Sequence, residues 1–129
     1  MPTHEDPRPK MVEIAHLMYE RFMTNSAGGN VSCRVGDHIY ISPRYLGSKN
    51  RWKLTEEMIL VFDRDFNIVE GEMSRLSREG RMHFACYRSY PLINGVIHAH
   101  PRFLNVFAAT GRPLSPTSQY TEKFGTLRV

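Results

Sequence analysis

The residues best suited to chemistry lie in Gly95-Val96-Ile97-His98-Ala99-His100, which Pro101 follows at once. An apolar run bounded by glycine and proline predicts a buried strand. Because side chains alternate between the two faces of a strand, His98 and His100 should project from the same side. Two neutral imidazoles side by side form half of a metal site, since imidazole nitrogen is a good ligand for zinc and similar ions. The spacing alone, however, is more often found in histidines that only make hydrogen bonds.

Three further motifs carry groups that suit an anionic ligand. Gly28-Gly29-Asn30 can bring backbone N–H groups close to an anion, and Asn30 adds an amide. Ile41-Ser42-Pro43 offers a hydroxyl beside a rigid turn. Ser77-Arg78-Glu79 precedes a predicted helix, where a phosphate or a carboxylate is stabilised, and Glu79 could serve as a metal ligand or a base. Each motif taken alone is more typical of an ordinary turn or helix cap.

The hydrophobic pattern predicts the elements that position these motifs. A helical stripe extends from Lys10 to Met23, and Pro101 to Gly111 predicts a second helix. A third helix should follow Glu79 and end near Tyr90, with Met82, Ala85 and Cys86 facing the core. Strands are expected over residues 31–35, 38–42, 59–63 and 68–70, with a turn at 36–37, a loop at 43–53, one helical turn at 55–57, and a loop from 112 that holds a late strand at 127–129.

The order of these elements predicts an α/β or α+β fold with one mainly antiparallel sheet and helices packed on it. Residues 1–9 contain three prolines and are expected to form a flexible N-terminal arm. Residues 10–129 are expected to form a single domain, because 129 residues are enough for one hydrophobic core.

The composition narrows the function classes. Hydrophobic residues make up 41% and charged residues 23% of the chain, as in ordinary globular proteins. The net charge of +4 comes from scattered basic residues, which suits small anionic ligands and shows no basic-aromatic pattern for nucleic acid. Cys33 and Cys86 form no pairing motif, and the sequence shows neither a signal peptide nor an apolar run of membrane length. We therefore expect a cytoplasmic protein with reduced thiols that binds no membrane.

Taken together and in order, the motifs resemble those of the class II aldolase/adducin family. The matching blocks are Gly-Gly-Asn-Val-Ser, Ile-Ser-Pro, Val-Glu-Gly-Glu, Ser-Arg-Glu-x-x-Met-His and Asn-Gly-Val-Ile-His-Ala-His-Pro. The resemblance covers nearly everything from Val12 to Val129, with the spacing between blocks intact. An ordered set of blocks is far more specific than any one block.

The resemblance implies a three-layer α/β/α sandwich around a mostly antiparallel sheet. It also implies a homotetramer that acts on a small sugar phosphate with a divalent metal, usually zinc. His98 and His100 match two of the three metal-binding histidines, and Glu79 matches a catalytic acid/base that can also contact the metal. Four residues match the family's substrate and phosphate contacts: Gly29, Asn30, Ser42 and Ser77.

The sequence departs from the family pattern in three places. The third metal-binding histidine of the family lies downstream of Val129, so we expect a domain truncated at its C-terminus with an incomplete metal site. Tyr45 stands where many members carry a glycine that admits a phosphate. Arg78 replaces the second serine of the common Ser-Ser-Glu, and its planar fork can pair with a phosphate or carboxylate of the substrate.

The expected function is that of a metal-dependent aldolase-type lyase acting on a small phosphorylated sugar. Retro-aldol cleavage would pass through a metal-stabilised enediolate while Glu79 moves the proton. Three alternatives share the scaffold, namely a sugar-phosphate epimerase, a dehydratase, and a decarboxylase of an oxo-acid phosphate. A further alternative is a non-catalytic adducin-like module or an inactive remnant.

Overall fold

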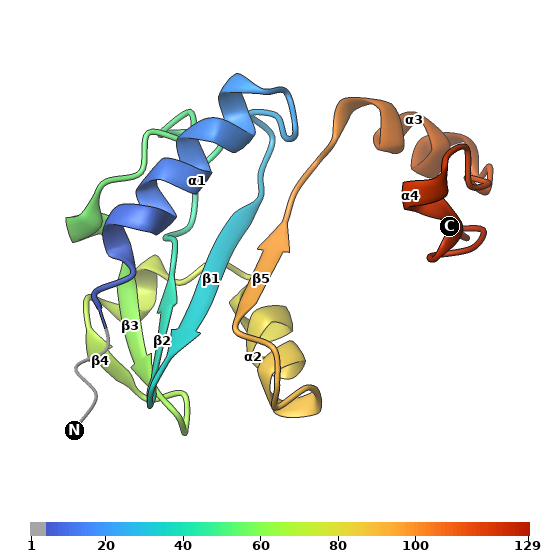
Figure 1. The fold of residues 1–129 in the computed structure, drawn as a ribbon. Coiled ribbons are helices and arrows are strands. Elements are labelled where there is room, and N and C mark those ends of the chain that lie inside the picture. Colours follow the sequence, from blue (N-terminus) through green and yellow to red (C-terminus); the bar gives the residue numbers. More distant parts are fainter. Residues whose placement is uncertain (1–4) are drawn as a thin grey trace.

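The computed structural model describes residues 5–129, and its centre is one five-stranded antiparallel sheet (Figure 1). The strands lie in the order β4-β3-β2-β1-β5. Their bounds are β1 Asn30–Val35, β2 His38–Ile41, β3 Leu60–Asp63, β4 Ile68–Glu70 and β5 Gly95–His98. The helices are α1 Arg8–Glu20, α2 Gly80–Ser89, α3 Arg102–Thr110 and α4 Gln119–Glu122, with short 3-10 turns at Glu56–Met58 and Met73–Arg75.

Two apolar clusters hold the layers together, one on each face of the sheet. On one face α1 packs with Val31 of β1 and with the buried side chains of the loop that follows β2. On the other face α2 packs with Ile39 and Ile41 of β2 and with β3. Alternate residues of one strand thus face different helices, as the pleat requires. This arrangement confirms the expected α/β fold with an antiparallel sheet between helices.

The hairpin of β1 and β2 agrees with the prediction and fixes the centre of the sheet. Gly36 and Asp37 form its turn, and Val35 pairs with His38. Gly36 has a φ of 58°, a left-handed conformation that glycine adopts without a steric penalty. The hairpin therefore places Asn30 at the end of β1 where the glycine motif enters the sheet.

The face of α2 that meets the core differs from the prediction. Gly80, His83, Phe84 and Tyr87 are buried, whereas Met82 is exposed. The observed set has the i, i+3, i+4, i+7 spacing of one helix face. The prediction was wrong because it ranked small apolar residues above an imidazole that makes hydrogen bonds inside the core.

The segment β5 was predicted to be a buried strand and is instead an edge strand. It pairs only with β1 in the described sheet, and Ile97 remains 58% exposed. The helices α3 and α4 lie beyond this edge and away from the sheet (Figure 1). Neither of them has a buried residue. No helix in the described part of the chain is both long and apolar enough to cross a membrane.

Two boundaries also differ from the expected ones. The first helix begins at Arg8 and ends at Glu20, so it includes two residues assigned to the N-terminal arm and excludes Phe22. Phe22 has a φ of 56° and is 75% exposed, because the chain has already left the helix there. Residues 1–4 lie outside the described residues, and the flexible arm stays a prediction. Near the C-terminus, α4 interrupts the expected loop, and the late strand is reduced to a single bridge between Leu114 and Leu127.

Candidate active site

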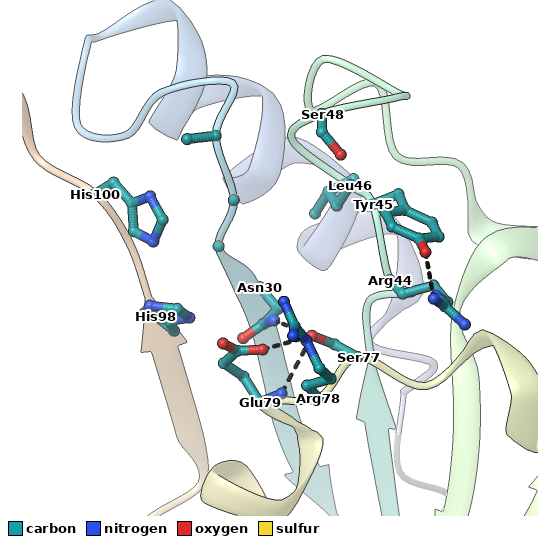
Figure 2. A pocket seen from close by; sticks show the side chains of 13 residues that line it. Asn30, Arg44, Tyr45, Leu46, Ser48, Ser77, Arg78, Glu79, His98 and His100 are labelled. Atoms are coloured by element: carbon teal, nitrogen blue, oxygen red, sulfur yellow. Dashed lines mark hydrogen bonds between the residues drawn. The ribbon is translucent and has the colours of Figure 1, made fainter.

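A cavity of about 580 Å³ lies where the glycine motif, the start of α2 and the end of β5 meet (Figure 2). Its walls contain all but one of the predicted site residues, although these come from segments far apart in the sequence. The lining residues from the predicted motifs are Gly28, Gly29, Asn30, Ser77, Arg78, Glu79, His98 and His100. The loop after β2 forms the opposite wall through residues 44–46 and Ser48. Strand pairing accounts for part of this convergence, because Asn30 and His98 are directly opposite each other on neighbouring strands.

The glycine motif is required by close packing beneath the cavity. Gly29 has a φ of 115°, and a Cβ atom there would lie 2.6 Å from the Trp52 ring and 2.8 Å from the carbonyl oxygen of His98. A Cβ atom on Gly28 would lie 3.1 Å from Cε1 of His100. Trp52 is fully buried, and its Nε1–H donates to the carbonyl oxygen of Asn25 at 2.8 Å. The backbone at Gly28 and Gly29 thus forms a bare wall that a larger residue would fill.

The hydroxyl of Ser77 connects the glycine motif with Glu79. Its oxygen accepts hydrogen bonds from Asn30 Nδ2 at 3.0 Å and from the backbone N–H of Glu79 at 3.3 Å. Its proton is donated to Glu79 Oε2 at 3.1 Å. A hydroxyl offers one donor and two acceptor positions, so all three are used. Glu79 stands at the N-cap position of α2, where the helix dipole stabilises a carboxylate.

His98 and His100 lie along the same wall, as the alternation of a strand predicts (Figure 2). Their ring centroids are 5.0 Å apart at an interplanar angle of 64°. The buried Nδ1 atom of His98 has no hydrogen-bond partner among residues 5–129. A buried ring nitrogen without a partner is costly, and two adjacent imidazoles are chemically suited to a divalent ion such as zinc. The pair therefore fits two positions of a metal site.

A third protein ligand is not in place beside this pair. No group of three His, Cys, Asp or Glu residues within residues 5–129 is arranged to hold one ion. Glu79 lines the same cavity, but its Oε2 is engaged by Ser77 and the residue does not complete a triad with the histidines. Catalytic zinc sites commonly have three protein ligands, so the described residues supply only part of one.

Ser42 is the predicted site residue that the structure does not bring to the cavity. It is fully buried, and its Oγ accepts a hydrogen bond from the backbone N–H of Val31 at 3.0 Å. The hydroxyl therefore fixes the exit of β2 against β1, and Ser42 does not line the cavity. Its contribution is to hold the loop that follows.

Sequence reasoning missed two residues near the cavity, Arg44 and Trp52. Tyr45, noted above at an expected glycine position, lines the cavity with a φ of 63°. The guanidinium carbon of Arg44 lies 4.3 Å from the centre of the Tyr45 ring. Trp52 was assigned to a loop, but its side chain is completely buried and packs beneath Gly29. Its backbone has a positive φ of 62°. A single tryptophan in a polar segment was the signal available in the sequence.

His83, the histidine of the Ser-Arg-Glu-x-x-Met-His block, lies directly behind the cavity wall. Its Nε2 is 2.6 Å from Asn30 Oδ1, and its Nδ1 is 2.6 Å from Ser32 Oγ. Burial, aided by a smaller effect of His98 and opposed by Glu79, lowers the pKa of His83 to about 4. The imidazole is therefore neutral near pH 7.

Comparison with known proteins identifies the family that the sequence motifs suggested. The model of the class II aldolase and adducin N-terminal domain matches residues 9–129. The chain belongs to the class II aldolase and adducin family. Class II aldolases depend on a divalent metal ion.

The names of several relatives of this chain state an enzymatic activity. An L-fuculose phosphate aldolase of Methanococcus maripaludis strain C7 is 34% identical over 105 residues, which cover 80% of this chain and 54% of that protein. A 3-oxo-tetronate 4-phosphate decarboxylase of Haemophilus influenzae is 27% identical, covering 92% of this chain and 58% of that protein. The chain thus spans little more than half the length of these curated relatives.

Solved structures show the same fold. An L-fuculose 1-phosphate aldolase superimposes with a TM-score of 0.73 at 30% identity, over 86% of this chain and 51% of that chain. An L-fuculose 1-phosphate aldolase from Glaciozyma antarctica superimposes with a TM-score of 0.68 over 87% of this chain and 47% of that chain. Its identity of 18% supports the shared fold alone.

Proposed function

We propose that this chain provides the phosphate-binding wall and the proton-transfer group of a metal-dependent aldolase-type lyase that cleaves a small phosphorylated sugar. The observation that carries the proposal is the single cavity in which the Gly28–Asn30 motif, Glu79 and the His98/His100 pair converge. Several of the relatives are named L-fuculose phosphate aldolase. The first substrate class to test is therefore a ketose or aldose phosphate similar in size to L-fuculose phosphate.

Each group of residues has a distinct task in this proposal. The backbone at Gly28 and Gly29, with the amide of Asn30, would bind the phosphate, because a bare backbone allows N–H groups to approach an anion. Glu79 would move the proton of the substrate hydroxyl as the carbon–carbon bond breaks. Ser77 holds one carboxylate oxygen of Glu79, so the other is free to face the substrate.

His98 and His100 would hold the divalent ion, which we expect to be zinc. When bound, the ion supplies Lewis-acid stabilisation of negative charge that develops on the substrate oxygens. The buried, unpartnered Nδ1 of His98 and the 5.0 Å spacing of the rings support this assignment. With two histidines in place and no third ligand among residues 5–129, the affinity of this chain for zinc should be modest. We also propose that the active assembly is a homo-oligomer, a tetramer by family resemblance.

The test combines turnover with metal content. The chain is incubated with L-fuculose 1-phosphate and excess zinc, and release of dihydroxyacetone phosphate is followed in a coupled assay. Glu79→Gln should abolish release and leave bound zinc unchanged, whereas replacing both His98 and His100 by alanine should lower bound zinc. Zinc content that is the same in the double variant and the parent chain would remove the histidines from the proposal. Unaltered turnover in Glu79→Gln would remove Glu79.

A decarboxylase of an oxo-acid phosphate is the second candidate, and Arg78 is the observation that favours it. Its side chain is exposed at the cavity wall and forms no ion pair with any residue described. A guanidinium there can bind a carboxylate through two hydrogen bonds. If this candidate holds, a 3-oxo-tetronate 4-phosphate should release carbon dioxide, and Arg78→Ser should raise its KM far more than that of a sugar phosphate that has no carboxylate.

A further inference from the structure

A chain of hydrogen bonds leads from the buried side of α2 to the cavity wall. It crosses from the helix to β1, returns to the helix, crosses to β1 again and ends at the carboxylate. The successive contacts are Tyr87 Oη to Ser32 Oγ at 2.8 Å, Ser32 Oγ to His83 Nδ1 at 2.6 Å, His83 Nε2 to Asn30 Oδ1 at 2.6 Å, Asn30 Nδ2 to Ser77 Oγ at 3.0 Å, and Ser77 Oγ to Glu79 Oε2 at 3.1 Å.

The donor of each hydrogen bond can be deduced by starting from the carboxylate of Glu79, at the end of the chain of bonds. A carboxylate only accepts hydrogen bonds, so Ser77 must donate its single proton to Glu79. The Ser77 oxygen must then accept from Asn30, which requires the NH₂ group of the amide on that side. The amide oxygen of Asn30 consequently faces His83, and only an N–H at Nε2 of His83 can donate to it.

The other ring nitrogen of His83, Nδ1, also has a hydrogen-bond partner. In a neutral imidazole with its proton on Nε2, Nδ1 is an acceptor, and the Ser32 hydroxyl donates to it. Ser32 can in turn accept from the hydroxyl of Tyr87. His83 is completely buried, so water cannot replace either partner. In each of the five hydrogen bonds the donor is therefore the residue farther along the chain of bonds from Glu79.

We propose that His83 is a positioning residue of the site, whose Nε2–H fixes the amide of Asn30 so that its NH₂ group faces the ligand. Ser77 takes one of the two protons on Asn30 Nδ2, and the second remains to bind an anionic oxygen at the cavity wall. An inverted amide would present its oxygen there and repel a phosphate. The inference rests on the proposed function, because it assumes that the ligand binding at Asn30 is a phosphate.

The test measures binding of inorganic phosphate and of dihydroxyacetone phosphate to the whole chain by NMR titration. His83→Phe keeps a ring but leaves Asn30 without a donor, and affinity should fall about tenfold, the effect of one lost hydrogen bond. His83→Gln places an amide N–H near the position of Nε2, so its affinity should return to within about twofold of the parent. Phe84→Leu, a buried neighbour on the same helix, is the control for general loss of stability and should leave affinity unchanged.

The protonation state of the ring is read independently of ligand binding. Long-range ¹H–¹⁵N spectra of the parent chain should show the His83 proton on Nε2, and the side-chain NH₂ signals of Asn30 should shift in His83→Phe but not in Phe84→Leu. A proton on Nδ1, or Asn30 signals that do not respond to His83→Phe, would overturn the inference. Equal phosphate affinity in His83→Phe and the parent would do so as well. A parent chain that binds no phosphate contradicts the proposed function instead, while the ring proton and the Asn30 signals still decide the position of the amide.

Discussion

In the candidate site the backbone of Gly29 packs against the buried ring of Trp52 and leaves no room for a side chain. An added methyl group at Gly29 would lie 2.6 Å from that ring, and the φ of 115° is unfavourable for any side chain. Gly29→Ala should therefore lower the free energy of unfolding by about 2–4 kcal/mol, combining backbone strain with overpacking. Urea unfolding monitored by tryptophan fluorescence measures this change. Gly95→Ala is the matched control, because its new methyl group meets only Ser32 O at 3.7 Å. Equal losses in the two variants would contradict the packing argument.

His83 gives a pH dependence with a defined sign. Its pKa is about 4 in the folded chain, mainly because of burial, and about 6.5 when the side chain is free in water. As the pH falls from 6.5 towards 4, the unfolded chain binds a proton that the folded chain does not, so the free energy of unfolding decreases. Above pH 6.5 His83 contributes no pH dependence. Urea unfolding of the parent and of His83→Gln across this range should show a steeper loss of stability in the parent. Parallel curves would show that His83 is not held neutral.

At the scale of elements, the loop after β2 has the packing of a core segment. Leu46, Trp52 and Leu54 are each no more than 1% exposed and belong to the cluster beneath α1. Side chains from this loop form one wall of the cavity and the floor beneath Gly29. The loop therefore couples the hydrophobic core to the site.

Trp52 provides a direct measurement of this coupling, because it is the single tryptophan of the chain. A buried indole should emit at short wavelength and resist quenching by acrylamide until the chain unfolds. Trp52→Ala should cost about 3–5 kcal/mol, the range for removing a buried aromatic side chain, and should weaken phosphate binding by releasing the Gly28–Gly29 backbone. Tyr90→Phe, at an exposed aromatic residue, should change neither quantity. Native-state quenching as strong as that in urea would contradict the buried position.

The comparison of predicted and observed elements shows which signals a sequence carries. The β1–β2 hairpin and α3 were predicted because local turn chemistry marks their limits, at Gly36-Asp37 and at Gly111. Strand alternation predicted that His98 and His100 project from the same side, and their ring centroids do lie 5.0 Å apart, although β5 ends at His98. The buried face of α2 was predicted wrongly. His83 is stable in the core because it forms hydrogen bonds with residues of β1, and no local sequence pattern reveals these partners. For the same reason the convergence of three of the four motifs was expected only from the resemblance, and strand pairing explains the part that brings Asn30 beside His98.

At the scale of the whole molecule, the region beyond the β5 edge carries a group of exposed apolar side chains. The helices α3 and α4 have no buried residues and stand apart from the sheet (Figure 1). The exposed apolar side chains of this region are Phe103, Leu104, Val106, Tyr120, Phe124, Leu127 and Val129. Exposed apolar clusters of this kind mark surfaces that bind other apolar surfaces. The domain core and this surface should consequently respond to different substitutions.

The separation predicts that Phe103→Ser combined with Phe124→Ser will change association without changing stability. Both rings are more than 60% exposed, so their loss removes little folded-state packing, and the free energy of unfolding in urea should stay within about 0.5 kcal/mol of the parent. Binding of a hydrophobic dye and the concentration dependence of the sedimentation coefficient should both decrease, because two large apolar side chains leave the surface. Leu92→Ser is the matched control: this side chain is 93% exposed and lies outside the region, before β5, so its loss should leave sedimentation unchanged. A large drop in the urea midpoint of the double variant would show that α3 and α4 pack on the core in solution and would refute their independence from the sheet.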